Sequence, residues 1–121
     1  MENLLSGDYL CSVDAGRINF PYRLKGIFDR QPPLFYNRKD GCLTLDLGQS
    51  KIPSSFEPRD YSFRNGRLFL SESIWLETIG RRNAVVIAGV GDYIEIWGEE
   101  KWELEQQKIA KLREVSEPGY S

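Results

Sequence analysis

The stretch Val13–Pro21 (VDAGRINFP) returns imperfectly fifty positions later as Phe63–Ser71 (FRNGRLFLS). In both copies a polar residue precedes a Gly-Arg pair, which is typical of a tight turn with positive φ, and an alternating apolar run follows. Each copy therefore predicts a strand, a glycine turn and a second strand that begins at an arginine, Arg17 or Arg67.

A second pair of segments repeats at an offset of fifty-one. Leu34–Leu45 and Val85–Ile96 each hold two apolar runs around a turn that contains Asp and Gly. Two copies are too few for a solenoid, which needs about three units to bury a continuous core. Since each half would leave an apolar sheet face open, the repeat predicts a pseudo-dimer in which the halves close against each other around a pseudo-twofold axis.

Size and composition indicate one compact domain. The chain has 121 residues, of which 40% are hydrophobic. No apolar run approaches the roughly 20 residues of a membrane span, and residues 1–5 lack the pattern of a signal peptide. We therefore expect a cytoplasmic protein with no membrane partner.

The residue content argues against catalysis and metal binding. The chain has no histidine, and its two cysteines, Cys11 and Cys42, are too few ligands for a zinc site. Phosphate-binding, dinucleotide-binding and serine-hydrolase motifs are missing from the sequence. The sequence therefore predicts no enzyme, no cofactor, no metal and no small-molecule substrate, with Cys42 a buried structural thiol rather than a reactive one and no disulfide.

The net charge of −2 is distributed unevenly along the chain. Residues 1–97 carry twelve basic and twelve acidic side chains, and the acidic excess comes from residues 98–121. A neutral body is compatible with a basic face on one side, which is the electrostatic footprint of a nucleic-acid binder.

Local patterns predict the elements between the repeats. Pro21 favours a short helix at Tyr22–Lys25 that Gly26 closes, and Ser71 is the expected N-cap of a second helix that ends at Gly80. Strands are expected at 9–13, 17–20, 34–36, 42–45, 61–63, 67–70, 85–87 and 93–96, and a linker over 48–58.

The segment Glu99–Glu114 is expected to be an exposed amphipathic helix that docks on the body or on a neighbouring subunit, with Trp102, Ile109 and Leu112 on one face. Trp75 and Trp97 add to Trp102 more aromatic surface than a small barrel needs to bury. Because tryptophan is enriched at interfaces, this surplus favours self-association.

Four segments together resemble the MraZ family, whose chains carry two AbrB/SpoVT-type repeats: Val13–Pro21, Asp40–Leu45, Val86–Trp97 and Glu100–Glu103. The resemblance covers about residues 7–104 and is most specific in the segment Val-Gly-x-x-x-Glu-Ile-Trp that ends at Trp97. It implies a β-rich α+β fold, namely a pseudo-twofold swapped-hairpin β-barrel of two AbrB-like repeats with short helices and a C-terminal helix.

The implied organisation is a first repeat at 1–49, a linker at 50–58, a second repeat at 59–104 and a C-terminal helix and tail at 105–121. Residues 1–104 would form one interlocked domain. The implied function is a cytoplasmic, nucleoid-associated transcriptional regulator. It would recognise short direct repeats of DNA upstream of cell-division and cell-wall genes, as a homo-oligomer such as a ring.

In the family that this chain resembles, basic residues of Lys-Gly-Arg turns face DNA. The matching positions here are Arg17 and Arg67. Arg64 can partly replace the lysine that is missing from the second turn, and Asn19 and Arg23 complete the candidate DNA-binding set.

The chain departs from the family pattern at both turns, where Ala15 and Asn65 stand in place of lysine, at Ser71, which stands in place of a proline, and in its shorter connector. The alternative hypothesis is a degenerate AbrB-fold scaffold that oligomerises and binds a protein partner without binding DNA. Arg17 and Arg67 would then only brace surface ion pairs, each worth at most about 1 kcal/mol. Retention on DNA at low salt distinguishes the two hypotheses.

Overall fold

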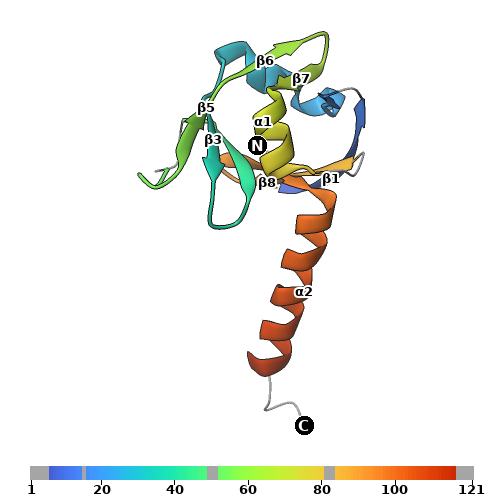
Figure 1. The fold of residues 1–121 in the computed structure, drawn as a ribbon, viewed down its shortest axis with the longest axis vertical. Coiled ribbons are helices and arrows are strands. Elements are labelled where there is room, and N and C mark those ends of the chain that lie inside the picture. Colours follow the sequence, from blue (N-terminus) through green and yellow to red (C-terminus); the bar gives the residue numbers. More distant parts are fainter. Residues whose placement is uncertain (1–5, 15, 49–51, 81–83, 117–121) are drawn as a thin grey trace.

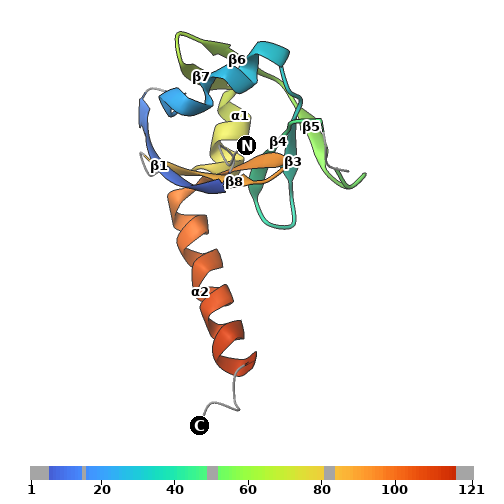
Figure 2. The same ribbon diagram turned by 180° about the vertical axis from the view of Figure 1, so that it is seen from behind.

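The fold is a nearly closed antiparallel β-barrel with three helices, described by a computed structural model for residues 6–14, 16–48, 52–80 and 84–116 (Figures 1 and 2). Within these ranges nine strands form one sheet in the order β5-β3-β4-β9-β8-β1-β2-β7-β6. The strands are β1 (Ser6–Asp14), β2 (Arg17–Asn19), β3 (Leu34–Asn37), β4 (Cys42–Asp46), β5 (Glu57–Arg59), β6 (Tyr61–Arg64), β7 (Arg67–Leu70), β8 (Ala84–Val90) and β9 (Tyr93–Gly98). The helices are η1 (Tyr22–Arg30, of the 3-10 type), α1 (Glu72–Thr78) and α2 (Glu99–Ser116).

The two ends of the sheet meet at Asp60. Strands β5 and β6 lie at opposite ends of the strand order, yet Asp60 alone separates them in the chain. β5 pairs with β3 and β6 pairs with β7, so this one stretch of chain closes the barrel on both sides.

The core fills the barrel because inward-facing positions alternate with outward-facing ones along the strands. Ile18 of β2 and Leu68 of β7 are paired and are both fully buried. The buried cluster consists of Cys11, Ile18, Phe20, Leu24, Phe28, Leu34, Tyr36, Leu43, Leu45, Leu68, Ile74, Ile79, Val85, Ile87, Ile94 and Ile96.

Several local predictions are confirmed. Asn65 and Gly66, in the turn between β6 and β7, have φ of 53° and 76°, the left-handed values that an Asn-Gly hairpin turn requires. Ser71 caps α1, since its Oγ accepts a hydrogen bond from the Ile74 N–H at 3.4 Å, and Gly80 follows the helix with φ of 76°. The predicted hairpins β3–β4 and β8–β9 are also present.

Two local predictions are wrong. Helix η1 does not stop at Gly26 but continues to Arg30, where Gln31 takes the left-handed conformation instead. It continues because its second half has a buried anchor, Phe28, whose ring stacks on that of Phe63 at 3.8 Å. Strand β5 begins at Glu57, inside the stretch expected to be linker, and it is held there by pairing with β3.

The C-terminal helix begins at Glu99, as predicted, and leaves the body after its first turns (Figure 1). At its base the Trp102 ring meets the Trp97 ring edge-on, with centroids 5.8 Å apart. The expectation of surplus tryptophan surface is wrong: Trp97 is buried, and Trp75 packs half-buried against the core. No helix of the described part of the chain is long and apolar enough to cross a lipid bilayer.

Candidate nucleic-acid interface

Three of the four predicted arginines gather on the outer face of the strands β2, β7 and β6. Where β2 pairs with β7, Arg17 lies opposite Phe69 and Asn19 lies opposite Arg67. Where β6 pairs with β7, Arg64 lies opposite Arg67. Residues directly opposite each other in an antiparallel sheet share a face. Because Ile18 and Leu68 point into the core, their neighbours in sequence point outward. We call this surface, made of Arg17, Asn19, Arg64, Arg67 and Phe69, the basic face.

The centre of the basic face is an aromatic ring between two guanidinium groups. The Arg64 Cζ lies 4.8 Å from the centroid of the Phe69 ring, and the Arg17 Cζ lies 5.8 Å from it. Each such cation–π contact is worth about 0.5–1 kcal/mol at an exposed site. The ring therefore holds both guanidinium groups over the sheet without neutralising their charge.

A lysine that no sequence motif indicates lies beside the second Gly-Arg turn. The Cε and Nζ of Lys25, from η1, lie 2.7 Å from the position that a Cβ would take on Gly66. The Lys25 ammonium also lies 5.0 Å from the centroid of the Tyr22 ring. At the corresponding turn of the first half, a Cβ on Gly16 would meet no atom within 4 Å. Within the described part of the chain, the second Gly-Arg turn therefore has an ammonium group against its glycine and the first turn has none.

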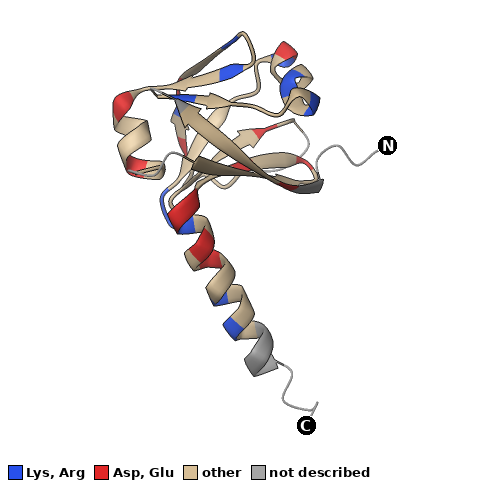
Figure 3. Cartoon of the chain, turned by 90° about the vertical axis from the view of Figure 1, so that its right-hand side faces the viewer, with Lys and Arg blue, Asp and Glu red and all other residues tan. Residues whose placement is uncertain are grey.

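The two other predicted residues, Asn19 and Arg23, lie on different parts of the molecule. Asn19 lies on the basic face and donates a hydrogen bond from Nδ2 to Ser12 Oγ at 2.9 Å. Arg23 is exposed on η1, outside the sheet, so the structure does not place it on the basic face. Figure 3 shows basic residues on the β6–β7 side of the barrel and on η1, at the end opposite α2.

The cations of the basic face are not neutralised by described neighbours. Among the described residues, neither Lys25 nor an arginine of this face forms an ion pair with a carboxylate. A cation without such an ion pair has more to gain from a phosphate than one that is already paired.

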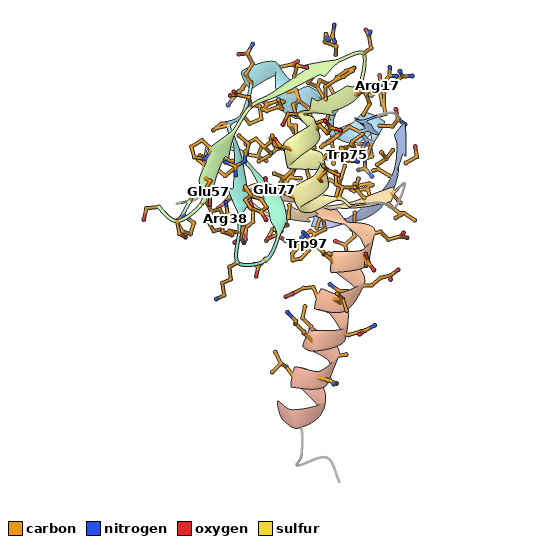
Figure 4. The ribbon with its side chains drawn as sticks, in the orientation of Figure 1. Arg17, Arg38, Glu57, Trp75, Glu77 and Trp97 are labelled. Carbon is orange, nitrogen blue, oxygen red and sulfur yellow. The ribbon has the colours of Figure 1, made fainter. Side chains whose placement is uncertain are left out.

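A second cluster of charges, on the other side of the barrel, shows the contrast. Glu57 of β5 accepts two hydrogen bonds from Arg38, at 2.7 and 2.9 Å, and one from Arg59 at 2.9 Å (Figure 4). Arg59 also lies 3.7 Å from Glu77 of α1, and both guanidinium groups lie 5.3 Å from the Tyr36 ring centroid. The hydrogen bonds from Arg38 and Arg59 lower the pKa of Glu57 to about 2. This cluster links β5 to its neighbours and so serves the closure of the barrel.

The two cysteines lie in the interior of the fold. Both thiols are free, and burial raises the pKa of Cys11 to about 11 and raises the pKa of Cys42 as well. A raised pKa disfavours the nucleophilic thiolate form of a cysteine. This agrees with the expectation that Cys42 is a buried structural thiol and not a reactive one. Among the described residues, no group of three or more His, Cys, Asp or Glu side chains could hold a metal ion.

The sequence signals for this surface differ in strength. The turn motif predicted Arg17, Arg64 and Arg67, and strand alternation after Arg67 could have indicated Phe69 as their outward neighbour. Lys25 had no such signal, because it is 41 residues before the turn it approaches. No protein-family model matches the chain, and no curated protein sequence is detectably similar to it.

Proposed function

We propose that this chain is a MraZ-like DNA-binding transcriptional regulator that binds its site as an oligomer through the basic face. The observation that carries the proposal is the set of arginines around Phe69, with Lys25 beside them, none paired with a described carboxylate. Sequence-independent affinity for DNA comes from such cations, because each phosphate that they neutralise releases counterions.

The pairing register supports the swapped-hairpin part of the proposal. The repeat matches Ile18 with Leu68 and Thr44 with Glu95. In the sheet, Ile18 pairs with Leu68 and Thr44 pairs with Glu95, so each residue pairs with its own counterpart in the other half. Residues on a twofold axis must pair in this way. The halves also alternate in the strand order, since the hairpin β3–β4 lies beside β9 and the hairpin β1–β2 lies beside β7.

The pairings away from these two contacts agree with the same exchange of halves. Tyr9 of β1 pairs with Ile87 of β8, and the equivalent pair is Arg59 of β5 with Leu34 of β3. This correspondence matches Leu34 with Ile87 instead of Val85, its match in the sequence repeat. It requires the β3–β4 turn to be two residues longer than the β8–β9 turn, and the strand bounds have that difference. Interlocked AbrB-type repeats account for all of these pairs.

The dimensions of the basic face suit the major groove. Two adjacent strands at a spacing of about 4.8 Å form a ribbon that the groove, about 12 Å wide, can admit. The central ribbon β2–β7 carries Arg17, Asn19 and Arg67, whose side chains are the types that read guanine and adenine edges. Arg64 and Lys25 lie beside this ribbon and would contact the flanking phosphates.

Selection from a random duplex library tests the proposed specificity. We expect the full chain to enrich sequences that contain a short motif in direct repeat, because an oligomer presents several copies of one face in the same orientation. The Arg17→Ala and Arg67→Ala variants should both lose this enrichment. Arg67→Ala should keep the wild-type melting temperature, because Arg67 is exposed and exposed charges contribute little to folding. Arg17→Ala should lower the melting temperature only slightly, through loss of its contact with the Phe69 ring. Enrichment without a repeated motif, or no retention of any duplex at low salt, would refute the proposal.

A second candidate function, a scaffold that binds a protein without DNA, is favoured by one observation. The exposed apolar side chains include Leu10 on β1 and Leu104 and Leu112 on α2, at 68%, 54% and 66% exposure. These side chains lie outside the basic face, so a protein contact there does not compete with DNA. The scaffold interpretation predicts binding that is independent of Arg17 and Arg67.

A further inference from the structure

Among the described residues, helix α2 contacts the body at its base. Lys101 Nζ donates hydrogen bonds to the Glu77 carbonyl oxygen at 2.6 Å and to the Gly41 carbonyl oxygen at 3.4 Å. Trp102 packs there against Trp97. Beyond this base the helix extends away from the barrel (Figures 1 and 3). Side chains 106–112 are exposed.

The extended part of α2 carries an apolar stripe. Leu104, Ile109 and Leu112 are 54%, 36% and 66% exposed. A helix in water draws most of its stability from the packing of such a stripe, and an isolated helix of about 12–15 residues is marginal. The stripe is therefore suited to a partner that covers it.

The charges along α2 favour a second α2 as that partner. The first half of the helix is rich in glutamate, at residues 99, 100, 103 and 105, and the second half has Lys108 and Lys111. In an antiparallel pair, the acidic half of each helix lies along the basic half of the other. In a parallel pair, like charges would lie side by side, and the two helix dipoles would also be aligned unfavourably.

We propose that a second copy of this chain docks its α2 antiparallel on α2, with the pair centred between Gln106 and Gln107. This register places Leu104 of each copy opposite Ile109 of the other, and Glu105 opposite Lys108. Glu105 precedes Lys108 by three residues and Ile109 by four, so these side chains share one face of the helix. The pair is therefore self-complementary in both shape and charge.

A hollow beside the base of α2 can receive the C-terminal part of the partner's α2. It has a volume of about 300 Å³ and is lined by Trp97, Lys101 and Leu104 together with the β3–β4 turn. The antiparallel register brings the Leu112 end of the partner helix to this hollow. Because α2 and the basic face lie at opposite ends of the molecule, the pairing leaves both basic faces open (Figure 3). The interface does not depend on the proposed DNA binding.

Charge exchange in the full chain tests the register. Sedimentation equilibrium up to about 200 µM should show self-association of the wild type in the micromolar range, as expected for a small interface. Glu105→Lys alone and Lys108→Glu alone each place like charges opposite each other twice, and each should weaken association about tenfold or more. The double variant Glu105→Lys with Lys108→Glu should recover it.

Mixing the two single variants is the most direct test of the antiparallel register. In an antiparallel pair of one chain of each kind, every 105–108 contact is again between opposite charges, so the mixture should associate more tightly than either variant alone. The matched control is Gln107→Lys, which adds a charge on the opposite face of α2 and should leave association unchanged. Circular dichroism of every variant checks that helix content is retained.

A monomeric wild type at this concentration would overturn the proposal. So would single variants that associate like the wild type, or a mixture that gains nothing over its components. A control variant that weakens association as much as Glu105→Lys would equally refute the assigned face. Recovery in both the double variant and the mixture supports the antiparallel register.

Discussion

Removal of Lys25 should reduce the salt dependence of DNA binding, although Lys25 lies outside both repeat turns. If Arg17, Arg64, Arg67 and Lys25 each release one condensed counterion, whether the cation lies at a base edge or at a phosphate, the logarithm of the association constant falls with a slope of about −3.6 against the logarithm of salt concentration, about 0.9 for each cation. Between about 50 and 200 mM salt, this slope corresponds to a loss of affinity of about 150-fold. The Lys25→Ala variant should have a slope of about −2.7 and lose about 40-fold over the same range.

Fluorescence anisotropy of a labelled duplex across a salt series measures this slope directly. The control is Lys39→Ala, because Lys39 is exposed in the β3–β4 turn, away from the basic face. Lys39→Ala removes the same charge from the chain and should keep the wild-type slope. If Lys25→Ala keeps the wild-type slope, or if Lys39→Ala reduces it equally, the assignment of Lys25 to the interface is refuted.

Three further predictions concern the fold. Leu68→Ala should cost about 2–5 kcal/mol in a urea melt, because Leu68 is fully buried opposite Ile18; a cost below about 1 kcal/mol would contradict the assigned core. Because the folded-state pKa of Glu57 is lowered from 4.5 to about 2, its pairing with Arg38 and Arg59 stabilises the fold above about pH 4.5 and is lost as the pH falls towards 2. The difference in melting temperature between the wild type and Glu57→Gln should therefore shrink from pH 6 to pH 3, and a constant difference would exclude this pairing as its source. Residues 1–50 alone should be unfolded or aggregate, because their strands pair with the second half; a monomeric fragment that melts cooperatively would show that the halves are independent.

Secondary structure was predictable where short-range chemistry decides it. The Asn65–Gly66 turn follows from the low cost of positive φ at these two residue types, and the Ser71 cap follows from a hydroxyl three residues before an unpaired N–H. Both features need only neighbours in sequence. The end of η1 was not predictable in this way, because the burial of Phe28 against Phe63 overrides the glycine at 26.

The sequence by itself determined the two repeats, their hairpins and the arginines at the start of β2 and β7, because turn chemistry and strand alternation are local properties. The tertiary structure alone decided which charges act together. Strand pairing between the halves brings Arg17 to the Phe69 ring, which Arg64 contacts from its own hairpin, and packing of η1 carries Lys25 to Gly66. The same closure pairs Arg38 and Arg59 with Glu57 and so distinguishes these structural cations from those of the basic face. An arginine has the same charge in both places, and only the side chains that folding brings next to it decide whether that charge is already neutralised.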